Sequence, residues 1–326
     1  MLKKAVVTSL LAIVTAMPAS AGGVEPGLIS AKAKWVAHLD IAGLRQTGLG
    51  KLLTEKLQED SIQARIAEFS EAFGFDPQKD LDSITLWGVG YQPDQGIAMF
   101  TGTFDRDKLL ALLDAAEGHT ALEHGEHVIH RWTQQPEDLD DDGVRHGVIY
   151  RKDVVMIARS GELLKSALDQ LATEDGTLAD PEAPELLPKR SKGTFLFLSG
   201  TEMGRIAEGR PKAKWTRLVS SAHVEMGQDG KTVFANCRMT AKDPRNAKRL
   251  RNVLSGLVAM IQLQIAAAEE NDQPVPFWAP LADAVEFGGE GRAVTMSLAM
   301  EQEQLLEIVR KAKEAKARRA EEGDRE

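Results

Sequence analysis

The chain has 326 residues, 43% of them hydrophobic, which supports a folded core, excludes a disordered chain and allows two ordinary domains. Its formal net charge of −9 argues against nucleic acid or anionic lipid as a general partner. Cys237 is the single cysteine, so no internal disulfide can form, and its place in a predicted strand indicates a buried, inert thiol.

Residues 1–21 have the three parts of a secretory signal peptide. Two lysines precede an apolar run from Ala5 to Met17, and the small residues Ala19-Ser20-Ala21 form a cleavage site. The run is shorter than the roughly 20 residues of a membrane span, although an uncleaved anchor is the alternative. Cleavage leaves Gly22 rather than a cysteine at the N-terminus, so no lipid anchor is expected. The sequence therefore predicts a periplasmic or secreted protein.

The same succession of elements is predicted twice along the chain. Strand-like runs begin at Trp35 and at Thr194, and each is followed by a pair of strands with a short turn, over residues 83–104 and 221–240. Because short turns join neighbouring strands antiparallel, we predict an α+β protein of two related halves. Each half is expected to be an antiparallel sheet with helices packed on one face.

A third match extends the predicted duplication. The run VVMIARSGELLKSAL, from Val154, and the run VTMSLAMEQEQLLEIV, from Val294, are each a strand that leads into a helix with a Leu-Leu pair. Earlier helices in the two halves have Asp105 and Asp243 as predicted N-caps, and Pro244 stands at the first helical position.

A proline-rich segment separates the two halves, because proline at this density blocks both helix and inner strand. The predicted organisation is a signal peptide over 1–21, a first α+β repeat over 22–175, a linker over 176–192, a second repeat over 193–312 and a charged tail over 313–326.

The most apolar stretch after the signal peptide runs from Val253 to Ala268. Gln262 and Gln264 interrupt it, so we predict a buried helix and no integral membrane segment after signal cleavage. The predicted inner face of this helix carries Leu250, Leu254, Leu257, Val258, Ile261 and Ile265.

One acidic loop has metal-binding spacing. Asp138, Asp140 and Asp142 alternate and a glycine follows, as in the first positions of a calcium loop. The twelfth position, which should be a bidentate Glu, is Ile149, and the usually apolar eighth is Arg145. The three aspartates are therefore a weak calcium candidate, the alternative is a solvated acidic turn, and no other cofactor is expected.

Four of the seven histidines lie close together in sequence, at His119, His124, His127 and His130. On a helix His124 and His127 would share a face that suits zinc. The β-branched pair after His127 instead favours a strand that starts near Glu126, which places His127 and His130 on opposite faces. We therefore predict ordinary histidines rather than a zinc site.

The runs FGFDPQKDLDSITLWGVG, TGTFDRDKLLALL and VVMIARSGELLKSALDQL, behind a signal peptide, resemble uncharacterised exported bacterial proteins with duplicated α+β repeats. The resemblance covers about residues 33–172, with a weaker echo over 193–312, and it implies no activity and no site residues. The sequence holds no catalytic signature. We therefore expect a non-catalytic exported protein that binds an unknown protein or small-molecule partner between its halves; the alternative is an extracytoplasmic hydrolase.

Overall fold

The structure, a computed structural model, describes residues 23–57, 63, 66–67, 70, 75–134, 142–173, 176–183, 185–207, 211–271 and 279–323. The expected signal peptide lies outside these residues and stays a prediction.

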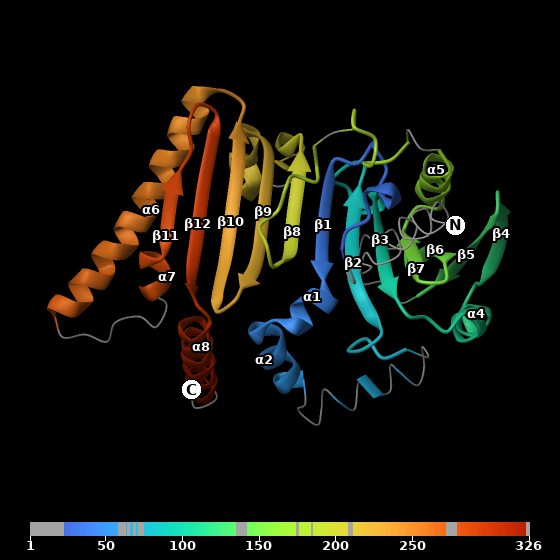
Figure 1. Ribbon diagram of the computed structural model, residues 1–326, viewed down its shortest axis with the longest axis horizontal. Coiled ribbons are helices and arrows are strands. Elements are labelled where there is room, and N and C mark those ends of the chain that lie inside the picture. The colour runs from blue at the N-terminus through green and yellow to red at the C-terminus, as the bar shows by residue number, and fades with distance from the viewer. Residues whose placement is uncertain are drawn as a thin grey trace, which may run out of the picture.

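One antiparallel sheet of twelve strands forms the body of the molecule (Figure 1), in the order β11-β12-β10-β9-β8-β1-β2-β3-β7-β6-β5-β4. The strands are β1 (Trp35–Asp40), β2 (Leu81–Gly88), β3 (Gly96–Gly102), β4 (Thr120–His124), β5 (His127–Thr133), β6 (Val144–Arg151), β7 (Val154–Ala158), β8 (Thr194–Thr201), β9 (Val219–Asp229), β10 (Thr232–Ala241), β11 (Val285–Gly288) and β12 (Ala293–Glu301). The predicted α+β class with antiparallel pairing is confirmed.

The two halves of the chain meet at the centre of this sheet. Strand β1 pairs with β8 from Trp35↔Gly200 to Leu39↔Leu196, so the two expected sheets are continuous. The strand order outward from the junction is β1-β2-β3-β7 on one side and β8-β9-β10-β12 on the other. The two strand orders match, as a duplication would produce. The duplication and its boundaries stay predictions.

Helices connect and follow these strands. They are α1 (Ile41–Gln46), α2 (Gly48–Leu57), α4 (Arg106–Ala115), α5 (Gly161–Leu171), α6 (Pro244–Glu270), α7 (Ala279–Asp283) and α8 (Gln302–Gly323), with short 3-10 helices η1 (Pro26–Leu28), η2 (Pro93–Gln95), η4 (Met203–Ala207) and η5 (Pro211–Leu218). The predicted caps are confirmed, because the Asp105 carboxylate accepts from Lys108 N at 3.1 Å and that of Asp243 from Asn246 N at 2.8 Å.

Two hydrophobic cores lie on opposite faces of the sheet. Core 1 lies on the face that carries Val36 and Trp87, called face A, and α5 packs there through Leu164. Core 2 lies on face B, where Ala247 and Leu250 of α6 pack against Met239. The register places these sets on opposite faces, because directly paired residues of antiparallel strands point the same way.

The helices of the first half also divide between the faces, rather than gathering on one face as expected. Helix α4 lies over face B and α5 over face A. The reason is visible in β3 and β7, whose apolar residues point to both sides of the sheet: Met99 and Met156 to face A, Phe100 and Val155 to face B.

The predicted linker is an irregular segment that packs on core 1. Thr177 forms a β-bridge with Ser30, and Leu178, Leu186 and Leu187 contact core 1, with Leu186 fully buried. This segment is therefore held against the first half.

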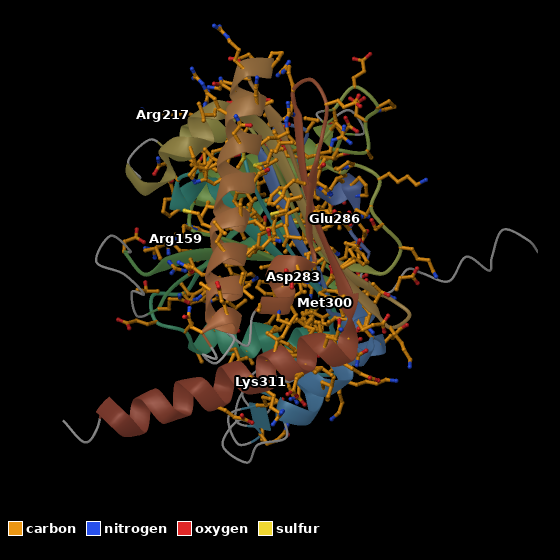
Figure 2. The ribbon with its side chains drawn as sticks, turned by 90° about the vertical axis from the view of Figure 1, so that its left-hand side faces the viewer. Arg159, Arg217, Asp283, Glu286, Met300 and Lys311 are labelled. Atoms are coloured by element: carbon orange, nitrogen blue, oxygen red, sulfur yellow. The ribbon has the colours of Figure 1, made fainter. Side chains whose placement is uncertain are left out.

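Helix α6 differs from its prediction as a buried helix. Its inner stripe packs on the sheet, but Leu257, predicted to face inward, is 48% exposed. Figure 2 views the molecule from the side on which α6 lies and shows α8 extending away from the body, with Lys311 part-way along it. The helix α8 continues to Gly323, well into the expected tail.

Candidate functional site

An apolar cavity lies between α4 and face B of the sheet. It has a volume of about 520 Å³. The lining residues are Phe75, Phe100, Phe104, Leu109, Leu112, Leu113, Ala116, His130, Trp132, Gln134, Gly147, Val148, Ile149, Val155 and Ile157. This composition is typical of small-molecule sites, which are mostly apolar with a few polar groups.

Helix α4 stands off the sheet at this cavity. Its Leu109, Leu112 and Leu113 face the sheet, yet none of the residues of α4 is buried. By contrast, α5 packs directly on face A and buries Leu164 completely. Apolar side chains on both sides of the gap therefore remain available to a ligand.

Two hydrogen-bonded histidines lie at one end of the apolar cavity. His130 lines the cavity and is 7% exposed, and its Nδ1 lies 3.0 Å from Nε2 of His119. The two rings are nearly parallel, with centroids 5.3 Å apart. Nδ1 of His119 lies 3.4 Å from a carboxylate oxygen of Asp114. Burial lowers the pKa of His130, and the neighbouring His119 lowers it further.

These contacts favour one direction for the hydrogen bond between the two rings. The Asp114 carboxylate favours a proton on Nδ1 of His119, so Nε2 of His119 accepts the hydrogen bond that Nδ1 of His130 donates. Nε2 of His130 is then an acceptor. An acceptor at the end of an apolar cavity suits the hydroxyl or protonated carboxyl group of a ligand.

The other clustered histidines lie apart from this pair. Strand β5 begins at His127, as predicted, and the ring of His127 packs on Tyr150 at 4.9 Å, whereas His124 bonds to Asp169 at 2.7 Å. Within the part of the chain that the structure describes, no group of three or more His, Cys, Asp or Glu side chains is arranged to hold a metal ion.

The calcium candidate falls largely outside the described residues. Asp138 and Asp140 are not among them. Asp142 is, and its carboxylate accepts a hydrogen bond from Val144 N at 2.9 Å, as in an acidic turn. Calcium binding by these three aspartates stays a prediction.

A second, polar cavity of about 570 Å³ lies on face A of the second half. Its lining comes from the linker and from β8, β9, β10 and β12: Glu185, Pro188, Lys189, Ser199, Gly200, Ser221, Ala222, His223, Glu225, Asn236, Cys237, Arg238, Thr240, Thr295, Met296 and Ser297. This face is open because α8 extends away from the sheet instead of covering it as α5 covers the first half.

Glu225 ties the linker to the floor of the polar cavity. Burial disfavours its ionised form, but hydrogen bonds from Ser191, Asn236 and Thr194 outweigh that effect and lower the pKa of its carboxyl group. Burial raises the pKa of Cys237, which favours the inert thiol that the sequence predicts. The hydrogen-bonding capacity of Glu225 is thus used within the protein.

An aromatic cluster beside the polar cavity joins the two halves. The Phe197 ring lies 5.5 Å from that of His38 and 6.1 Å from that of His223, and the Arg190 guanidinium lies over it at 4.6 Å. Burial lowers the pKa of His223, and neither of its ring nitrogens has a hydrogen-bond partner. The cluster is held by packing, by the cation–π contact and by the hydrogen bond of 2.8 Å between His38 Nδ1 and Thr85 Oγ1.

Comparisons with known proteins identify no family. No protein-family profile matches the chain, and no curated protein matches it. Solved structures of the Treponema protein TP0453 are similar in part: crystal form III has a TM-score of 0.47 at 9% identity and covers 88% of this chain and 98% of that chain. Crystal form IV has a TM-score of 0.46 at 10% identity, with 88% and 97% covered. A TM-score below 0.5 does not establish a shared fold, so nothing is carried over from TP0453.

Proposed function

We propose that this chain is a non-catalytic, exported binding protein that holds an apolar ligand, of the class of a fatty acyl chain, between α4 and the sheet. One observation carries the proposal: α4 has no buried residue although its leucines face an apolar sheet surface across the cavity. Burying that surface with a ligand is favourable by about 25 cal/mol per Å². Export rests on the predicted signal peptide alone.

The polar cavity is the second candidate, because residues of the linker between the two halves line it and a site between the halves is expected from the sequence. No residue of the first half lines it, and its buried carboxylate already accepts hydrogen bonds from the protein. Ligand pockets are typically apolar with few polar groups. The apolar cavity therefore supports binding better.

A hydrolase is the alternative function, and the series Asp114, His119, His130 is the arrangement that most favours it. Acyl transfer by a histidine base needs a nucleophile beside the imidazole. None of the described residues that line the apolar cavity carries a hydroxyl or a thiol. A binding role needs no such group.

The test is binding of the fluorescent fatty acid cis-parinaric acid to the chain from Gly22 onward. Ala116→Trp places a large ring in the cavity, and we expect it to weaken binding by about tenfold, which corresponds to about 1.4 kcal/mol. The matched control is Ala111→Trp, an exposed position of α4 outside the lining, whereas Ala116 is the residue that caps the end of this helix. Circular dichroism checks that both variants are folded. Equal binding by both folded variants would show that the ligand lies elsewhere, and no binding by the unchanged protein would overturn the proposal.

A further inference from the structure

Helix α6 has apolar side chains on both its inner and its outer side. On the inner side Ala247 and Leu250 belong to core 2, and Ile265 packs with Ala279 and Ala282 of α7. By length and composition this is the one helix among the described residues that could span a membrane, from Pro244 to Ala268, yet only 6% of its apolar 18-residue stretch is buried inside the protein. The packing on the sheet therefore uses a small part of its apolar surface.

The outer side carries a contiguous apolar stripe. Val253, Leu257, Met260 and Leu263 are 62%, 48%, 59% and 69% exposed. Their spacing of three and four residues places them in one row along the helix, here called the outer stripe. A surface helix normally turns polar side chains outward, and an exposed apolar row marks an interaction site.

Charge along α6 is strongly asymmetric. Its first turns carry the exposed cations Arg245, Lys248 and Arg249, and no charged side chain follows from Asn252 to Ala268. Cations at a helix N-terminus are unfavourable for the helix itself, because the helix dipole is positive there. These cations stand in a protein whose net charge is −9, so they form a local site for anions beside the outer stripe.

We propose that α6 docks on the surface of a bilayer that contains anionic lipids. The outer stripe enters the boundary between headgroups and acyl chains, and the three cations bind lipid phosphates. The helix lies along the surface instead of crossing it, because its inner side is packed on the sheet. This inference rests on α6 and is independent of the ligand in the apolar cavity.

The experiment is sedimentation of the chain from Gly22 onward with vesicles of phosphatidylcholine, with and without phosphatidylglycerol. We expect binding to the anionic vesicles that weakens as salt is added. Leu257→Gln with Met260→Gln should reduce this binding by at least about tenfold, and Arg245→Gln with Arg249→Gln should do the same, because each cation near an anionic surface contributes about 1 kcal/mol. The control is Leu122→Gln with Val128→Gln, which changes exposed apolar residues of β4 and β5.

Other outcomes would overturn the proposal. Equal binding to both kinds of vesicle would exclude a role for the cations, and wild-type binding by the outer-stripe variant would exclude the stripe. The main competing occupant is a second copy of the chain. A dimer in sedimentation velocity that the outer-stripe variant dissociates, without vesicle binding by the wild type, would show that α6 is a dimer interface. Circular dichroism and thermal unfolding establish that each variant is folded.

Discussion

At the residue scale, His130 is a polar group whose pKa the fold lowers. It is buried at the end of the apolar cavity and bonded to His119, which is in turn near Asp114. The neutral ring fits this environment, because protonation would place a charge among apolar side chains. The same property should link the stability of the protein to pH.

We expect the free energy of unfolding to fall as pH drops below about 6.5, the usual pKa of histidine in an unfolded chain. Burial lowers the pKa of His130 and that of His223 in the folded protein, so below that pH the unfolded chain binds more protons. The fall should end once the folded-state rings are also protonated.

His130→Gln should make this decrease in the free energy of unfolding shallower, as measured by urea unfolding across the same pH range. His127→Gln, from the opposite face of β5, is the control and should keep the wild-type slope; an unchanged slope in His130→Gln would contradict the argument.

At the element scale, α4 and α5 should differ sharply in what their leucines contribute to stability. Leu164→Ala removes a fully buried side chain of core 1 and should cost about 2–5 kcal/mol. Leu112→Ala removes a half-buried side chain that faces the cavity, and should cost less than about 1 kcal/mol because few contacts are lost. Urea unfolding measures both. A similar cost for the two variants would mean that protein side chains fill the apolar cavity in solution.

The sequence predicts the elements better than the spaces between them. Strands such as β1 and β10, and caps such as Asp105 and Asp243, follow from local patterns that the structure retains. The apolar cavity could not be predicted, because the row of leucines on α4 has the same pattern whether the helix packs on the sheet or stands away from it. The one signal in the sequence that pointed to apolar residues on face B was the apolar run in each of β3 and β7, because such a run indicates a strand that is covered on both faces. In the same way, the spacing of apolar residues along α6 does not show how much of the helix surface the sheet covers.

At the scale of the whole molecule, the two cores share one sheet but lie on opposite faces of it. Core 1 is the larger and includes Phe197 of β8, although that strand belongs to the second half of the sequence. Leu186 of the linker joins the same core. By side-chain packing, then, β8 belongs with the first half. We therefore expect the sheet to open most easily between β8 and β9, and the linker to stay attached to the first half.

Hydrogen exchange at sub-denaturing urea tests where this boundary lies. Local opening follows the regions with fewest buried contacts, so the amides of β10 and β12, supported by the smaller core 2, should exchange first. The amides of β1, β2, β3 and β7 should exchange last, and those amides of β8 that bond to β1 should exchange with them. Mass spectrometry of peptides from each strand measures the order. If β8 instead exchanges together with β10 and β12, the two sequence halves open as units, and the β1–β8 pairing is the weak point of the sheet despite the burial of Phe197.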